Sequence, residues 1–249
     1  MIKIIFKLFG VALNGDCTLY DRHIWLKKNL ILLNEKSNLL DVGCGNGWAL
    51  FIAKKKGFKN SIGLSWEQKD IERIKSRTTD LNNIDFKVGD ARKLGEIKFE
   101  QKFDAIVNAE NIEHIIDSDK LIKDISDLLN DHGLLYLTTP NILYRDIYGD
   151  TPTKKPPIED GGHVIRGYSK ERLNKILKKH KLHIISVDYI SGTFSRKLLE
   201  LQRILPFKIL SKIVTLPLTI ICNFLDNIFY KNHKNNISLA LIAEKIDAE

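Results

Sequence analysis

The sequence is poor in cysteine, which excludes a disulfide-stabilised secreted fold. It has three cysteines in 249 residues, Cys17, Cys44 and Cys222, and they are widely separated and form no C-x-x-C pair. An odd number of scattered cysteines provides no disulfide framework, so we expect a protein of a reducing, cytoplasmic compartment. We also expect no bound metal.

Long hydrophobic runs are lacking as well. The uncharged run Ile213–Leu225 has 13 residues and is interrupted by Pro217, whereas a membrane-spanning helix needs about 20 apolar residues. The first 13 residues are apolar, but Lys3 and Lys7 break the run and no cleavage site follows. We interpret them as a short amphipathic element that packs on the domain or touches a membrane.

Positive charge exceeds negative charge, but unevenly along the chain. Hydrophobic residues make up 43% and charged residues 28%, as in ordinary globular proteins, and the formal net charge is +8. Residues 1–150 carry 22 basic and 22 acidic side chains, whereas residues 151–183 carry 9 and 3. The excess favours an anionic acceptor or surface over general nucleic-acid affinity. A solvated, lysine-rich helix from Lys170 to Lys181 explains most of it equally well.

The most informative stretch is Asn38–Trp48, N-L-L-D-V-G-C-G-N-G-W. An apolar run of β type leads into Gly43, Gly45 and Gly47, and a helical pattern follows from Ala49 to Lys56. This predicts a strand, a tight turn and a helix, the first unit of a nucleotide-binding α/β sheet. Glycine allows a ligand to lie against the backbone, and the helix start offers unpaired N–H groups.

The glycine spacing differs from that of dinucleotide-binding turns, which read G-x-G-x-x-G. The order here, D-x-G-x-G-x-G, resembles motif I of the class I S-adenosylmethionine-dependent methyltransferases. The resemblance covers roughly residues 20–190 and the last strand. It implies S-adenosylmethionine as cofactor, with Asp41 orienting a polar group and Cys44 a small residue nearby. The loop residues expected at the cofactor are Asp41, Gly43, Cys44, Gly45 and Asn46.

The ends of the second and third strands carry further cofactor candidates. Ser65 stands where this family usually has a ribose-binding carboxylate, and Trp66 is expected to cover the adenine or the sugar. Glu67 is either a ribose ligand or a charge that stabilises a helix start. Asp90, followed by Ala91, resembles the acidic residue that accepts the adenine amino group. A turn-forming Asp is the alternative.

The end of the fourth strand reads N-A-E-N-I-E-H, from Asn108 to His114. It resembles the E-x-x-E-H stretch of many small-molecule methyltransferases. The resemblance implies that Asn108 and Glu110 flank the methionine part of the cofactor and that His114 faces the transfer site. Histidine is the side chain that most readily serves as a base near neutral pH. The alternative is a histidine that only braces its loop.

Residues 142–169 are rich in Pro and Gly, which excludes regular structure. Long ordered loops on the carboxyl edge of an α/β sheet are often functional. We predict an acceptor lid in which His163 is a second candidate base, Arg166 a clamp for an anion or hydroxyl, and Tyr168 a further catalytic residue. The stretch E-D-G-G-H-V-I-R-G-Y resembles uncharacterised methyltransferases of glycan-modifying gene neighbourhoods. The alternative is a structural loop with a surface histidine.

The remaining pattern predicts a single α/β domain, residues 1–249, with a doubly wound, seven-stranded, mostly parallel sheet and an antiparallel last strand. Strands are expected at 39–42, 61–64, 85–88, 103–107, 134–138, 182–190 and 237–244, and helices at 20–34, 49–56, 120–129 and 170–180. Residues 192–236 are expected to be an amphipathic helical insertion. It lies on a membrane, forms a homodimer contact, or packs on the domain.

The predicted function is methyl transfer from S-adenosylmethionine to an oxygen or nitrogen of a small molecule. The favoured acceptor is a sugar, or an anionic or lipid-linked group on a sugar, in surface-polysaccharide assembly at the inner face of the membrane. Nucleic-acid methylation is disfavoured because no [D/N]-P-P-[Y/F] stretch follows the fourth strand. A nicotinamide dehydrogenase is disfavoured by the glycine spacing. A non-catalytic cofactor-binding partner protein remains an alternative.

Overall fold

The structure is a computed structural model that describes residues 17–77, 80–144, 162–205 and 208–246. The expected N-terminal amphipathic element and most of the expected lid lie outside the described residues.

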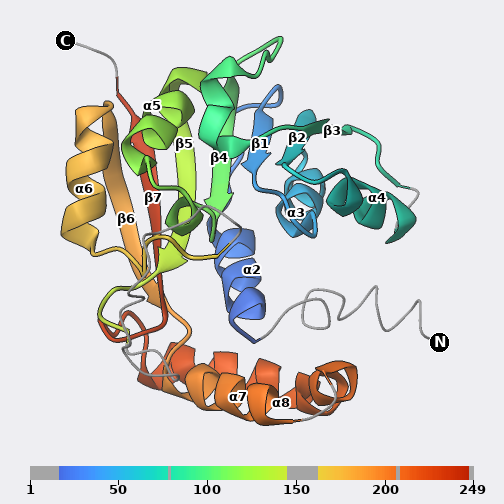
Figure 1. Cartoon of the computed structure of the whole chain (residues 1–249), viewed down its shortest axis with the longest axis vertical. Helices are drawn as coiled ribbons and strands as arrows, with labels where there is room; N and C mark the ends of the chain where they lie inside the picture. Colours follow the sequence, from blue (N-terminus) through green and yellow to red (C-terminus); the bar gives the residue numbers. More distant parts are fainter. Residues whose placement is uncertain (1–16, 78–79, 145–161, 206–207, 247–249) are drawn as a thin grey trace.

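A mixed seven-stranded sheet forms the centre of the molecule (Figure 1), with strand order β3-β2-β1-β4-β5-β7-β6. The first five strands of this order run parallel, and β7 pairs antiparallel with both β5 and β6. The strands are β1 (Asn38–Val42), β2 (Asn60–Ser65), β3 (Ile84–Val88), β4 (Phe103–Ala109), β5 (Leu129–Pro140), β6 (Leu182–Ile190) and β7 (Ser238–Lys245). This confirms the predicted fold class.

Helices cover both faces of the sheet. Because side chains alternate along a strand, Leu39 and Leu40 of β1 enter different cores. Leu40 packs in the core that includes residues of α5 (Ser118–Leu128) and α6 (Lys170–Lys179). Leu39 packs in the core that includes residues of α2 (Cys17–Asn29), α3 (Trp48–Lys56) and α4 (Gln68–Arg77). Burial on both faces explains the almost continuous apolar runs of the parallel strands.

Two predicted boundaries are wrong. The leading helix α2 spans Cys17–Asn29, so it begins before residue 20 and ends before the apolar residues that follow it. The turn expected at residues 130–133 is instead part of β5, beside a register shift in its pairing with β4. His132 takes the left-handed φ of 60° there, so the irregularity is absorbed within the strand.

The segment between β6 and β7 forms two helices, α7 (Thr193–Ile204) and α8 (Lys208–Phe229). Because β6 runs parallel to β5 and β1, α7 begins at the carboxyl edge of the sheet. Figure 1 shows α7 and α8 beyond that edge, with α2 between them and the sheet. Within the described ranges, none of the helices combines the length and apolar character that crossing a membrane requires.

Candidate active site

A cavity of about 260 Å³ opens at the carboxyl ends of β1, β2 and β3. Its lining residues are Gly43, Gly45, Leu64, Ser65, Trp66, Asp70, Gly89, Asp90, Ala91, Arg92, Asn111, His114 and Ile115. A larger, more open depression of about 570 Å³ lies at the opposite edge, where β1 and β5 begin, and contains none of these residues. The smaller cavity is the candidate site because ligands of parallel α/β sheets bind at the carboxyl edge.

The glycine turn that follows β1 forms one wall of the cavity. Gly43, Gly45 and Gly47 have φ values of 83°, 46° and 72°, a region that residues with a Cβ rarely adopt. A Cβ on Gly43 would lie 3.1 Å from the side chain of Asn111. The turn therefore requires glycine both for its backbone conformation and for the close approach of Asn111.

Asp41 and Cys44 lie behind this wall. Both are buried, and neither lines the cavity. Burial raises the pKa of Asp41 to about 7. Burial, and then the nearby Asp41, raise the pKa of the Cys44 thiol, so Cys44 is a poor nucleophile. The turn thus has a titratable carboxyl group beneath it and an unreactive thiol.

Ser65 and Asp70 form a pair that sequence reasoning missed. The Ser65 hydroxyl donates a hydrogen bond of 2.8 Å to Oδ2 of Asp70, and both side chains are buried and line the cavity. Asp70 also pairs with Arg73. Asp70 supplies a carboxylate five residues after the position where the family has one. A first-turn acidic residue in the next helix was the signal that could have found it.

Asp90 and Trp66, which the resemblance places near the adenine or the sugar, both line the cavity. Asp90 accepts hydrogen bonds of 2.9 and 2.8 Å from Nε of Arg92 and one of 2.9 Å from its backbone N–H. These bonds hold the pKa of Asp90 below its usual range. Trp66 is 53% exposed at the cavity rim. An exposed indole there can cover a flat ligand.

Two buried amides mark the other end of the glycine turn. Both polar side-chain atoms of Asn108 and the side-chain nitrogen of Asn111 are buried without a hydrogen-bond partner. An unpaired buried amide costs roughly 1–3 kcal/mol. Asn111 lines the cavity, so a polar ligand that bonded to its nitrogen would stabilise the site, whereas Asn108 is fully buried and does not line the cavity. Glu110, between them, has a φ of 50° and lies 3.5 Å from Arg22 of α2. The glycine turn, the cavity and these amides fit the expected cofactor.

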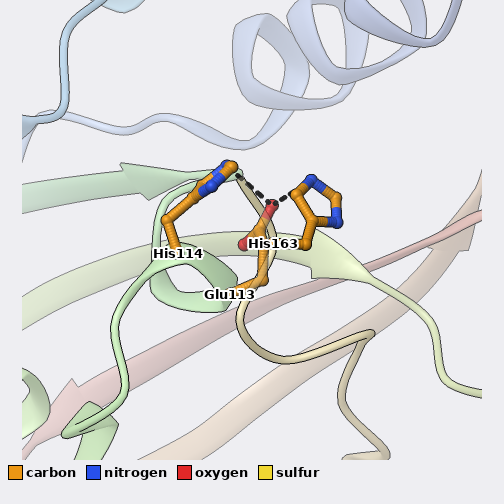
Figure 2. Close-up of side chains that lie close together, drawn as sticks. All are labelled: Glu113, His114 and His163. Atoms are coloured by element: carbon orange, nitrogen blue, oxygen red, sulfur yellow. Dashed lines mark ion pairs between the residues drawn. The ribbon is translucent and has the colours of Figure 1, made fainter. Parts of the chain in front are cut away.

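Glu113, His114 and His163 form a compact group (Figure 2). The Nε2 atoms of His114 and His163 each lie 4.0 Å from Oε1 of Glu113, and the two rings meet edge to face at 4.7 Å. Glu113 is fully buried, and its Oε2 accepts a hydrogen bond from Thr139. Its Oε1 has no hydrogen-bond partner. Sequence reasoning gave Glu113 no role.

Backbone contacts bring His163 to this group. The backbone carbonyl of Glu113, in η2 (Ile112–His114), accepts hydrogen bonds of 3.0 Å from the N–H groups of Val164 and Ile165. The carbonyl of Gly162 lies 2.9 Å from Nδ1 of His114. A carbonyl only accepts, so Nδ1 carries a proton and Nε2 of a neutral His114 is left as the basic atom.

The electrostatics of the group centre on Glu113. Burial, and then the charge of Glu110, raise the pKa of Glu113 well above its usual value. The ligand atoms of Glu113, His114 and His163 lie within 4.8 Å of one another, close enough to hold a metal ion. Two chemical uses are open to such a group: acceptance of a proton by an imidazole, and binding of a divalent cation.

Tyr168 and Arg166, the other two expected catalytic residues, are not part of the group formed by Glu113, His114 and His163. Tyr168 is fully buried in the core, with its ring under the guanidinium of Arg172 at 4.7 Å and its hydroxyl 3.5 Å from the carbonyl of Ile112. In this structure the Tyr168 side chain packs beneath η2 and has no exposure to an acceptor. Arg166 is exposed on the same segment. His23 of the leading helix α2 is not among the residues that line the cavity, and burial lowers its pKa to about 4.

A seven-stranded sheet of this order, with a glycine turn and a cavity at its carboxyl edge, defines a Rossmann-like α/β protein with a ligand site at the usual place. Residues 33–187 match a family described as a methyltransferase domain. The match covers more than half of the chain, and the chain belongs to this family. Relatives and solved structures that the chain resembles, described below, are also named as methyltransferases.

Curated relatives match part of the chain. A ubiquinone biosynthesis O-methyltransferase of Pelagibacter ubique is 36% identical over 104 residues, 41% of this chain and 42% of that protein. An (S)-coclaurine N-methyltransferase of Papaver somniferum is 34% identical over 110 residues, 42% of this chain and 30% of that protein. The matches thus span less than half the length of these relatives.

Solved structures share the fold. An S-adenosylmethionine-dependent methyltransferase from Mesorhizobium loti superposes with a TM-score of 0.62 at 17% identity, over 93% of this chain and 99% of that one. A coclaurine N-methyltransferase bound to N-methylheliamine and S-adenosylhomocysteine gives a TM-score of 0.57 at 16% identity, over 90% and 71%.

Proposed function

We propose that the protein transfers the methyl group to a hydroxyl oxygen of a small-molecule acceptor. The observation that carries this proposal is the position of His114, whose Nε2 faces Glu113 while its ring lines the cofactor cavity. When bound, S-adenosylmethionine supplies a methyl group that its sulfonium has already activated. The protein must align the acceptor, exclude water and remove the hydroxyl proton.

Proton removal is what separates a hydroxyl acceptor from an amine. A neutral amine attacks without a base, whereas a hydroxyl must lose its proton to an acceptor as the new C–O bond forms. Nε2 of His114 or of His163 takes that proton, and the ionised form of Glu113, 4.0 Å from both Nε2 atoms, stabilises the imidazolium that results. Alternatively, the three residues would hold a divalent cation, which would lower the pKa of the acceptor hydroxyl.

The acceptor class is inferred from the names of the relatives and from two stretches of the sequence. The curated relatives are named for an O-methylation and an N-methylation of small molecules, which supports a small molecule over a nucleic acid. None of the relatives named above is named for a glycan. We retain a sugar, or an anionic or lipid-linked group on a sugar, as a proposed acceptor because of the 159–168 stretch and the basic residues 151–183.

The first test is transfer of labelled methyl groups from S-adenosylmethionine into fractionated extract of the source cell. Label in a glycan or lipid-linked fraction would support the proposed acceptor. Label that disappears on nuclease treatment would replace it with a nucleic acid. Cofactor binding without any label would favour a non-catalytic partner role.

The second test distinguishes the two uses of the histidines. If His114 is a base, His114→Asn lowers the rate at least tenfold and a chelator has no effect. If the group binds a cation, a chelator abolishes transfer and added divalent ion restores it. His132→Asn, an exposed histidine on β5 paired with Glu244, is the matched control.

A further inference from the structure

Over its described side chains, residues 215–229, helix α8 has its polar and apolar faces exchanged relative to an ordinary surface helix. Thr215, Thr219 and Asp226 lie on its buried face, with exposed fractions of 6% or less. Ile221 and Phe224, on the opposite face, are 50% and 63% exposed. A surface helix of a globular protein normally buries its apolar stripe, so this orientation needs a physical cause.

Hydrogen bonds to α2 and α7 fix the polar face inward. Asp226 accepts hydrogen bonds of 2.9 and 2.8 Å from the N–H groups of Phe194 and Ser195, which are otherwise unpaired at the start of α7. Asn223 donates a 2.6 Å hydrogen bond to Asp21 of α2. Further along, Gln202 of α7 donates one of 2.8 Å to Thr215. Rotating α8 to hide its apolar face would break these bonds.

These hydrogen bonds therefore keep the apolar face of α8 exposed in the folded protein, as far as the described residues show. Its side chains recur at helical spacing and are at least 39% exposed: Leu218, Ile220, Ile221, Phe224, Ile228 and Phe229. Near the end of α7, Leu201 and Ile204 are 42% and 79% exposed. A concentration of large apolar side chains on one element of this kind marks an interaction surface.

The charge of the segment discriminates between partners. Residues 192–236 contain seven basic residues and two acidic ones, a net charge of +5, and one of the acidic residues, Asp226, is buried. Two copies that met through this surface would each bring the same positive charge. An anionic lipid surface is complementary in both respects: apolar side chains enter the acyl boundary, and basic side chains contact the headgroups.

We propose that the exposed face of α8 (Leu218–Phe229) binds the surface of a membrane that contains anionic lipids. Helix α8 lies beyond the carboxyl edge of the sheet (Figure 1), the same edge that holds the cofactor cavity and His114. Docking there places the cavity near the lipid. The consequence, an acceptor delivered from the membrane, rests on the proposed function, whereas the binding itself does not.

The test is sedimentation of the full chain with vesicles of phosphatidylglycerol and phosphatidylcholine, and with vesicles of phosphatidylcholine alone. We expect binding to the anionic vesicles that weakens with added salt. Phe224→Ser should reduce it about tenfold and Lys197→Glu about fivefold. The matched controls, Ile185→Ser on β6, where Ile185 is 55% exposed, and Lys36→Glu before β1, should bind as the unchanged protein does.

Thermal melts and the affinity for S-adenosylmethionine check that each variant is folded. Equal sedimentation with both vesicle types, or no effect of Phe224→Ser, would overturn the proposal. Self-association in analytical ultracentrifugation that Phe224→Ser abolishes, without vesicle binding, would make the face a homodimer contact instead. Because no acceptor is present, failure here leaves the proposed methyl transfer untouched, and failure of methyl transfer leaves vesicle binding untouched.

Discussion

The hydroxyl of Ser65 at the end of β2 donates a hydrogen bond to the buried carboxylate of Asp70 in α4. Asp70 therefore brings a carboxylate from the helix that follows β2 to the cavity, and the Ser65 hydroxyl orients this carboxylate.

This relationship predicts unequal effects of two substitutions on cofactor affinity. Asp70→Asn removes the charge that accepts hydrogen bonds from a ligand and should weaken binding of S-adenosylmethionine about 10- to 100-fold. Ser65→Ala should weaken it only a few-fold. Isothermal titration calorimetry measures both, with Glu72→Gln on the exposed face of α4 as the control. Stronger loss with Ser65→Ala would assign the ligand contact to Ser65 itself.

Asp41 should make stability depend on pH in a defined direction. Its pKa is about 7 in the folded protein and about 3.9 when unfolded. The folded state therefore holds the proton more tightly, and stability contributed by this group falls as pH rises from about 4 to 7.

Asp41→Asn removes this dependence because its side chain does not titrate. Compared with the unchanged protein, the variant should gain on the order of 3 to 4 kcal/mol at pH 8 relative to pH 4. Urea unfolding at the two pH values measures the difference. A gain of the same size at both values would contradict a titrating Asp41.

Glu113 should affect turnover much more than cofactor binding. Glu113→Gln keeps the size of the side chain and an oxygen for the hydrogen bond from Thr139, but it cannot become negative beside the two histidines. We expect at least a tenfold fall in kcat, with the affinity for S-adenosylmethionine within about twofold. A fall in cofactor affinity without a change in kcat would place Glu113 in the cofactor site instead.

Asp226 should be important for stability. It accepts two backbone hydrogen bonds at the start of α7 and is 6% exposed. Asp226→Ala leaves those N–H groups unpaired and should cost about 1–3 kcal/mol of unfolding free energy. Chemical denaturation of this variant beside Asn227→Ala, which changes an exposed neighbour, measures the cost. Equal losses would show that the cap contributes nothing.

The resemblance of the glycine motif indicated the cofactor class, and the sequence by itself determined the order of strands and helices and the glycine turn. These features depend on local chemistry: strand and helix periods, the φ values that glycine allows, and capping, such as the hydrogen bond from the N–H of Arg172 to Ser169 at the start of α6. The antiparallel closing strand also followed from resemblance at the level of the fold, and it was confirmed.

Only the tertiary structure decided which side chains meet. His163 reaches Glu113, 50 positions away in sequence, because backbone hydrogen bonds tie its segment to η2. Tyr168, expected at the reaction centre, is in the core. The outward orientation of the apolar face of α8 could not be predicted from its amphipathic pattern, because that pattern normally indicates that the apolar face is buried. The partners of Asp226 and Asn223 on neighbouring helices decide it, and these contacts exist only in the folded chain.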